Sequence, residues 1–158
     1  MALIEILTDS NSENELSKVI DKDIVKTNEI IYVKEKNIEN IKNIKLETIV
    51  INKKIEDKDI MKKIIDNSKY LIINKDNNPD FKNYKDMNNI ITYGYNSDSD
   101  ITISSIKEEK SFLCLQRNIT SIYGKKIDIQ EIRADVNYKI DIYNIMIIIA
   151  LTILYAKW

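Results

Sequence analysis

The first candidate for chemistry is a strand–turn–helix pattern near the start of the 158-residue chain. Such a segment binds phosphate when glycines let its backbone N–H groups approach the anion and a lysine and a Ser or Thr follow. Here Asp9 and Ser12 occupy the glycine positions. Glu13 stands in place of the lysine, and Asn14 in place of the hydroxyl. Because Asp9 and Glu13 would repel a triphosphate, we predict an ordinary capped helix start, with Ser12 and Glu15 as a capping box.

Two further polar clusters come directly after predicted strands. Asn74–Asp80 lies at the carboxyl end of a predicted parallel strand, where the ligands of open α/β sheets gather. A turn held by side-chain-to-backbone hydrogen bonds explains this cluster equally well. Asn96–Asp100 places oxygen atoms at alternate positions, as Ca²⁺ sites do, but it lacks the glycine and the terminal glutamate of an EF-hand loop. We predict a hydrated turn there and no metal site.

Composition excludes several classes of mechanism. The chain has no histidine, so the commonest metal ligand and general base is missing. Cys114 is the single cysteine, which excludes an internal disulfide, and we expect it to be buried. Lysine and arginine total 24 against 25 acidic residues, and Arg117 and Arg133 are the two arginines. Since lysine without arginine is a poor reader of phosphates and bases, nucleic-acid binding is not expected.

A series of predicted strands would position the candidate residues. Five apolar runs have strand character: Leu3–Leu7, Ile30–Val33, Leu46–Ile51, Tyr70–Ile73 and Asn89–Tyr93. Asp57 can cap a helix whose apolar stripe consists of Ile60, Met61, Ile64 and Ile65. This order of strand, helix and strand predicts a parallel pair with a right-handed crossover.

From Asp100 onward the pattern changes to strands without helices between them. Three runs, Asp100–Ile106, Phe112–Leu115 and Ile127–Ile132, are predicted to be antiparallel strands that extend the sheet. The predicted fold class is therefore α/β: a mostly parallel, Rossmann-like or P-loop-like sheet flanked by helices, with an antiparallel β extension. We expect one domain over residues 1–158.

The sequences at the two ends of the chain indicate where in the cell the protein is expected. The apolar run Ile145–Ala156 has about 12 residues, whereas a membrane span needs roughly 20. We predict a buried helix capped by Asp141, with a membrane tail as the alternative. The start, MALIEILTDS, carries Glu5 and Asp9 and no basic region, so we do not expect a signal peptide there. A cytoplasmic protein that does not associate with membranes is expected.

Five motifs follow one another along the chain: LTDSNSEN, ETIVINKKIED, KYLIINKDN, NIITYGYNSDSDITISSI and DIYNIMIIIALTIL. In this order they resemble the motifs of the central ATP-binding domain of the Mur ligase family. Thr8 and Asn11 match positions of the family's T-G-T-N-G-K-T loop. Asn52 matches the asparagine of V-x-T-N-I-x-x-D-H, and Asn74 and Asp76 match the strand end N-x-D-D.

The order and spacing of the last three motifs support the resemblance more strongly than any single motif does. Thr92, Gly94 and Asp100 match the I-T-F-G-x(n)-A-D segment of the family, and Asn144 matches the second asparagine of N-V-x-N-x-L-A-A-I-A. Asp141 replaces the first asparagine of that helix. The lysine that the family can carbamylate to hold a second metal falls near Met61 or Lys62, and both assignments stay open.

The resemblance implies an ancestor that activated a carboxylate with ATP and Mg²⁺ as an acyl phosphate, for attack by an amino group. This chain lacks the phosphate-binding glycines, the lysine and the histidine. It therefore resembles a shortened, degenerate central domain, with no catalytic or metal-binding residue and no bound cofactor. The positions that the resemblance implies as a remnant of the cofactor site are Thr8, Asn11, Asn52, Asn74, Asp76 and Asn144.

The expected function is that of a non-catalytic pseudoenzyme. It would act as a binding or assembly module linked to cell-wall peptidoglycan synthesis, through a protein partner or through self-association. The alternative is a nucleotide- or nucleotide-sugar-binding domain, or an ATP-dependent amide ligase, with a rebuilt site for ATP and Mg²⁺.

Overall fold

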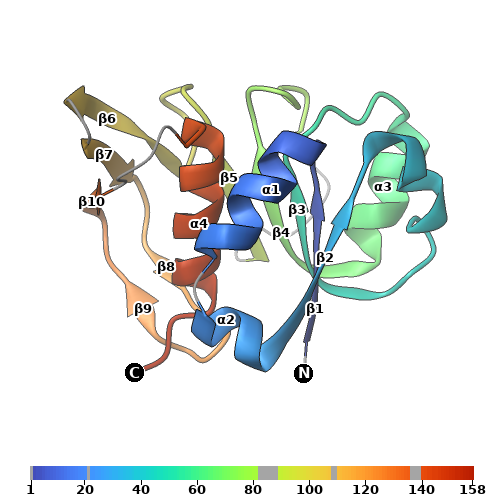
Figure 1. Ribbon diagram of the computed structural model, residues 1–158, viewed down its shortest axis with the longest axis horizontal. Helices are drawn as coiled ribbons and strands as arrows, with labels where there is room; N and C mark the ends of the chain where they lie inside the picture. Colours follow the sequence, from blue (N-terminus) through green and yellow to red (C-terminus); the bar gives the residue numbers. More distant parts are fainter. Residues whose placement is uncertain (1, 21, 82–88, 108–109, 136–139) are drawn as a thin grey trace.

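An eight-stranded sheet runs through the centre of the protein (Figure 1). The computed structural model describes residues 2–20, 22–81, 89–107, 110–135 and 140–158. Across the sheet the strands are β10 (Gln130–Asp135), β7 (Lys110–Leu115), β6 (Ile101–Lys107), β5 (Ile90–Tyr93), β4 (Ser68–Asn74), β3 (Leu46–Ile51), β1 (Ala2–Leu7) and β2 (Asn28–Val33). All five strands predicted before Asp100 are confirmed, each within two residues of its predicted bounds.

The half of the sheet from β2 to β5 is parallel. Helix α3 (Lys58–Asp66) connects β3 to β4, and Asp57 caps it by accepting the backbone N–H groups of Asp59 and Ile60. The predicted strand–helix–strand unit is therefore confirmed. Strands buried on both faces need continuous apolar runs, which explains Ile49–Ile51 in β3 and Leu71–Ile73 in β4.

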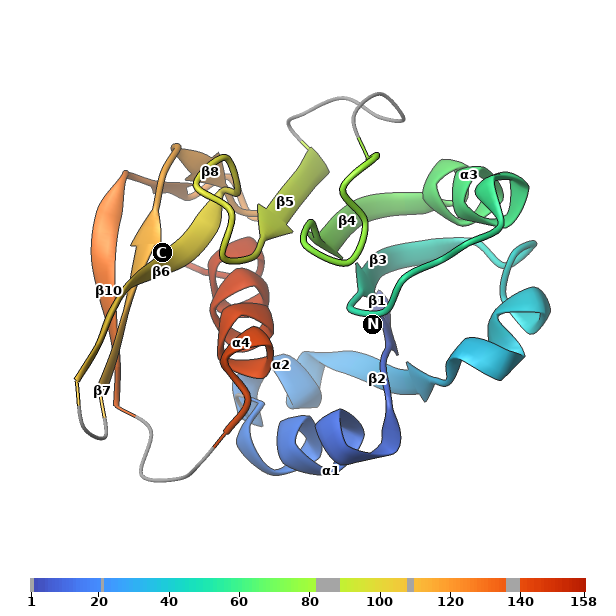
Figure 2. The same cartoon turned by 90° about the horizontal axis from the view of Figure 1, so that it is seen from above.

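Helices cover both faces of the parallel half (Figure 2). Helices α1 (Ser10–Val19), α2 (Lys22–Thr27) and α4 (Ile142–Leu154) lie on one face, where Ile4 and Ile6 of β1 join the first core cluster. Helix α3 and the 3₁₀ helix η1 (Glu35–Asn40) lie on the other face, where Leu7 joins the second cluster. The fold is thus a three-layer α/β structure.

The antiparallel extension is confirmed, with two corrections. β7 pairs with β6 on one side and with β10 on the other, both antiparallel. β6, however, is parallel to β5, and the two strands are joined through the single pair Tyr93 and Ile101. The predicted strand Ile127–Ile132 is divided: β9 (Lys126–Ile127) pairs with β8 (Ile119–Thr120) in a separate two-stranded sheet. Ile129 is 60% exposed at the division, where its N–H donates to Asn118 Oδ1.

The C-terminal apolar run forms a core helix, as predicted. Asp141 caps α4 by accepting the backbone N–H of Tyr143 at 2.8 Å, and most of the helix is buried against the sheet. Among the described residues, no helix has both the length and the apolar character needed to cross a membrane. Cys114, by contrast, is only half-buried, because it lies on the face of β7 opposite to Leu113 and Leu115.

A buried carboxylate lies on strand β1, between β2 and β3. Glu5 is 3% exposed, and alternation along the strand places it between Leu3 and Leu7 on the face of the second cluster. Its Oε2 has no hydrogen-bond partner among the described residues. Burial therefore raises the pKa of the Glu5 carboxyl above its ordinary value of 4.5.

Replacing Glu5 with leucine is expected to raise the free energy of unfolding by about 1–2 kcal/mol at pH 7, because it removes an unpaired buried polar group. The gain depends on pH. Above pH 4.5 the unfolded chain loses this proton while the folded protein keeps it, so the wild type loses stability as pH rises through the raised pKa. Denaturant unfolding of both proteins between about pH 4 and pH 8 measures this.

The matched control is Glu29→Leu, at an exposed glutamate on the neighbouring strand β2, which should change stability by less than about 0.5 kcal/mol. A difference between Glu5→Leu and wild type that stays constant over this pH range would show that Glu5 does not titrate abnormally.

Candidate functional site

The carboxyl ends of β1, β3, β4 and β5 meet at one edge of the sheet (Figure 2). The parallel strands have the order 2-1-3-4-5, so the chain changes direction across the sheet between β1 and β3. Open α/β sheets bind their ligands at such a crevice. The residues that follow these strands are Thr8, Asn52, Lys75 and Gly94.

Asn52 is the centre of a buried hydrogen-bond network at this edge. Its Nδ2 donates to Thr8 Oγ1 at 3.1 Å, and its Oδ1 accepts from Asn74 Nδ2 at 3.2 Å and from the Tyr93 hydroxyl at 2.7 Å. All four side chains are buried, and burial raises the pKa of Tyr93 well above its ordinary value. The polar atoms that could face a ligand are thus bonded to one another.

The asparagine cluster after β4 forms a turn. Asn74 Oδ1 accepts the backbone N–H of Asn77 at 3.1 Å, and Asn77 Nδ2 donates to the carbonyl of Asn52 at 2.7 Å. Asn78 Nδ2 donates to the carbonyl of Lys53 at 3.1 Å. These bonds agree with the explanation of the cluster as a turn held by side chains, and they join the loops after β3 and β4.

Asp76 connects three segments that are far apart in the sequence. Its Oδ2 accepts the backbone N–H of Tyr95 at 2.7 Å and the hydroxyl of Tyr143, on α4, at 2.8 Å. Its Oδ1 accepts the backbone N–H of Asn96 at 3.3 Å. Desolvation, together with the adjacent Asp76 carboxylate, raises the pKa of Tyr143. The carboxylate approaches Gly94 so closely that a Cβ there would lie 2.6 Å from Oδ1.

The amino end of α1 differs from the prediction. Asp9, and not Ser12, is the N-cap: its Oδ1 accepts the backbone N–H of Ser12 at 2.8 Å. Its Oδ2 forms an ion pair with Lys53 Nζ at 2.8 Å. The bond to Lys53, followed by that to Ser12, lowers the pKa of the Asp9 carboxyl. The predicted capping box was wrong because Glu15 Oε2 instead accepts from Asn144 Nδ2 at 2.6 Å.

The structure brings together some of the predicted site residues but not all. Thr8, Asn52 and Asn74 share one network, with Asp76 on the neighbouring loop. Asn11 is exposed on α1 and makes no described contact with the network. Asn144 is 0% exposed on α4, and its Oδ1 has no hydrogen-bond partner among the described residues.

Sequence reasoning missed three residues of this site: Lys53, Tyr93 and Tyr143. Lys53 directly follows Asn52, and Tyr93 ends a strand whose neighbour ends at Asn74, so strand ends were a usable signal for both. Tyr143 reaches the site from a helix 67 residues beyond Asp76, and no local pattern marks it.

The acidic run Asn96–Asp100 is occupied by protein contacts. Asp100 forms an ion pair with Arg117 at 2.7 Å. The backbone N–H of Thr92 donates to Asp100 Oδ2, and the backbone N–H of Asp100 donates to Thr92 Oγ1. Asp98 pairs with Lys75 at 2.6 Å. In the described part of the chain, no group of three or more His, Cys, Asp or Glu side chains is arranged to hold a metal ion.

An open hollow of about 570 Å³ lies beside the network, at the carboxyl ends of β1, β2 and β3. Its lining carries both signs of charge and consists of Thr8, Asp9, Ser10, Lys34, Glu35, Lys36 and Lys53. In comparisons with known proteins, no family model matches this chain and no similar curated protein was found. The chemical interpretation of the site therefore rests on its geometry.

Proposed function

We propose that this chain is a non-catalytic module that acts by binding or assembly, as a shortened relative of the Mur ligase central domain. In this proposal it works in the cytoplasm, near peptidoglycan synthesis, through a protein partner or further copies of itself. One observation carries the non-catalytic assignment: the amino end of α1 is capped by Asp9, a carboxylate of the chain itself.

A helix amino terminus attracts anions because its first N–H groups are unpaired and its dipole is positive there. Asp9 already supplies a negative charge at this position, and it accepts the N–H of Ser12. A phosphate would have to displace a carboxylate that is also paired with Lys53. The Asn52 network adds to this argument, because its side-chain bonds would have to break before its amide could contact a ligand.

The alternative is a nucleotide or nucleotide-sugar site that has been rebuilt. The observation in its favour is the hollow beside Thr8, where Lys34, Lys36 and Lys53 bring three positive charges to the crevice of the sheet. Lysine side chains can bind phosphate as point charges. In this reading Lys53 would exchange Asp9 for a phosphate.

Calorimetric titration with Mg-ATP, beside a melting curve, separates the two functions. The proposal expects no heat and no shift of Tm at millimolar Mg-ATP. Binding tighter than about 100 μM would raise Tm, because a ligand of the folded state stabilises it by mass action. Such a shift in the wild type would overturn the proposal and favour the rebuilt site.

Asp9→Asn is the matched variant. It keeps a helix-capping side chain but removes the negative charge and releases Lys53. A Tm shift with Mg-ATP in this variant alone would show that the Asp9 carboxylate is what excludes phosphate. No shift in either protein would show that the other departures from a phosphate-binding loop are sufficient.

A further inference from the structure

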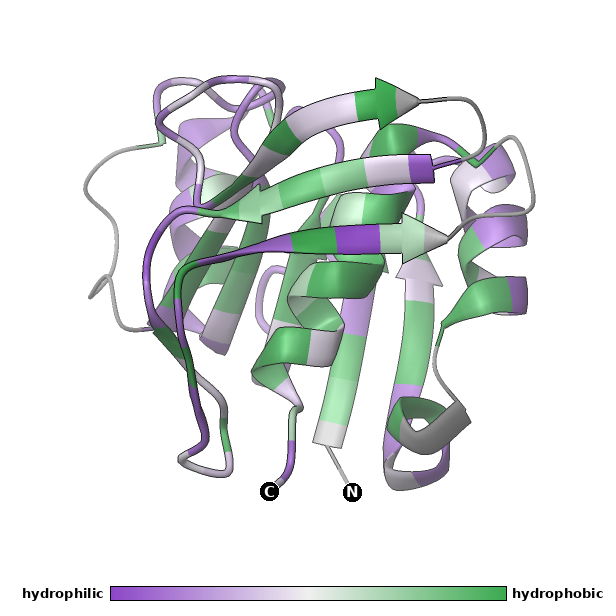
Figure 3. Ribbon diagram, turned by 90° about the vertical axis from the view of Figure 1, so that its left-hand side faces the viewer, coloured by the Kyte–Doolittle hydropathy of each residue, from purple (hydrophilic) through white to green (hydrophobic). Residues whose placement is uncertain are grey.

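Strand β10 is at one end of the eight-stranded sheet, and no described strand pairs with its outer edge (Figure 3). Its inner edge pairs with β7 along all six residues. An open edge presents a row of N–H and C=O groups that can pair with another chain. Short strands and charged side chains usually limit such pairing, so the charges on β10 decide what the edge can accept.

The charges of β10 alternate in sign along one face. Glu131 and Arg133 point to the same face of the sheet, two residues apart, and both are exposed. Ile132 and Ala134 point to the other face, where they pack against the first core cluster. Ser104 donates to Glu131 Oε2 at 2.8 Å, which keeps the carboxylate on the charged face.

We propose that β10 pairs with β10 of a second copy of this chain, antiparallel and about a two-fold axis that passes through Ile132. In this register Glu131 of each copy lies opposite Arg133 of the other, so the same favourable pair occurs twice. Opposite charges that face each other across antiparallel strands stabilise the pairing, whereas like charges destabilise it. The sheet would then continue from one copy into the other.

The neighbouring symmetric registers are unfavourable. A two-fold axis through residue 131 would place Glu131 opposite Glu131, and an axis through residue 133 would place Arg133 opposite Arg133. An axis midway between two residues would require charged and apolar faces to meet on the same side of the sheet. An axis through Ala134 would place Arg133 opposite Asp135, but it would pair only residues 133–135 of each strand. The register through Ile132 pairs residues 130–134 and is therefore the one we propose.

The side of the sheet opposite to these charges is apolar. Ile148 and Ile149 of α4 are half-buried and belong to the side of the sheet on which Ile132 lies. Figure 3 shows the apolar helix α4 directly behind the strands of this end of the sheet. A two-fold axis perpendicular to the sheet keeps the charged faces of both strands on one side and their apolar faces on the other.

This inference deepens the assembly part of the proposed function, because it names a second copy of the chain as the partner. It does not rest on the Asn52 network, which is formed by different strands. A dimer at β10 is compatible with Mg-ATP binding or with its absence. The two experiments can therefore fail separately.

Sedimentation equilibrium at about 50 μM tests the proposal on the full chain and three variants. The wild type should be a dimer. Arg133→Glu should weaken it at least about tenfold, because glutamates then face each other at both pairs. Glu131→Arg should weaken it similarly. The double variant Glu131→Arg and Arg133→Glu should recover the dimer, because each pair is restored with its charges exchanged.

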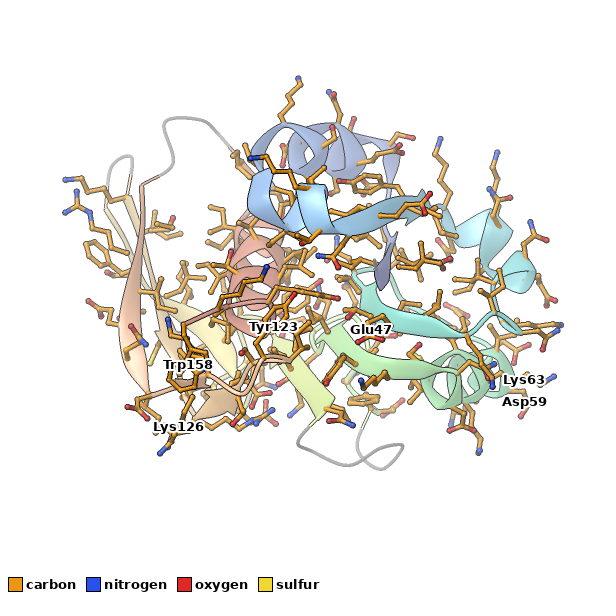
Figure 4. All side chains as sticks on the ribbon, turned by 90° about the horizontal axis from the view of Figure 1, so that it is seen from below. Glu47, Asp59, Lys63, Tyr123, Lys126 and Trp158 are labelled. Carbon is orange, nitrogen blue, oxygen red and sulfur yellow. The ribbon has the colours of Figure 1, made fainter. Side chains whose placement is uncertain are left out.

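The matched control is Lys63→Glu, the same change of charge at an exposed lysine on α3, far from β10 (Figure 4). It should leave the dimer unchanged. Circular dichroism checks that each variant is folded. If the double variant recovers the dimer, misfolding does not explain why the single variants lose it. A monomeric wild type, or a dimer that none of the β10 variants weakens, would overturn the proposal.

Discussion

Replacing Gly94 with alanine is expected to lower the free energy of unfolding by about 3 kcal/mol, or roughly 10 °C in Tm. The added Cβ would lie 2.6 Å from Asp76 Oδ1, closer than two such atoms can approach, and Gly94 has a φ of +156°. Asp76 cannot withdraw without breaking its bonds to the N–H groups of Tyr95 and Asn96 and to the Tyr143 hydroxyl. Thermal and denaturant unfolding measure the loss.

Two controls separate the clash from backbone strain. Gly124 has a φ of +83° but nothing within 4 Å of a Cβ, so Gly124→Ala should cost only about 1 kcal/mol. In the double variant Asp76→Ala and Gly94→Ala, the clash disappears. The loss of stability in the double variant should therefore be smaller than the sum of the losses in the two single variants. Additive losses would mean that Asp76 and Gly94 do not interact.

Replacing Leu151 with aspartate is expected to prevent stable folding, with a loss of at least about 4 kcal/mol. Leu151 is 0% exposed on α4 and belongs to the first core cluster, where a carboxylate would have no partner. The variant should lose its cooperative melting transition in circular dichroism. This change tests whether α4 is the helix on which the core depends.

Thr152→Asp is the matched control, because it introduces aspartate at the adjacent, exposed position of the same helix. It should cost at most about 1 kcal/mol, through the negative charge near the helix carboxyl end and loss of the bond from Thr152 to the carbonyl of Ile148. Similar losses in the two variants would contradict the assigned faces of α4. Ile148 is only half-buried, so aspartate there should cost less than at Leu151.

The parallel half of the fold was predictable from the sequence because its signals are local. Runs such as Leu46–Ile51 must be buried on both faces, and Asp57 and Asp141 are capping residues that directly precede apolar helices. Once parallel strands are placed side by side, their carboxyl ends must meet. The proximity of Thr8, Asn52 and Asn74 follows from that arrangement.

The remaining features depend on contacts between distant segments. Ser12 and Glu15 have the spacing of a capping box, but Glu15 bonds to Asn144 and to the backbone of Asp141, more than 120 residues away. The division of the strand near Ile129 likewise depends on a turn that Asn118 holds through the Ile129 N–H. Patterns within a window of a few residues contain no information about such partners.

The position of α4 in the chain has a consequence for synthesis. Every strand of the sheet precedes this helix, yet α4 supplies much of one face of the core, from Ile145 to Leu154. A ribosome makes the chain from its amino end, so the whole sheet emerges before the helix that covers it. Until residues 142–154 are released, that apolar face stays open to water and to other nascent chains. Final closure of this core therefore waits for the last helix, and the interval before it is when the apolar face of the sheet can bind other chains.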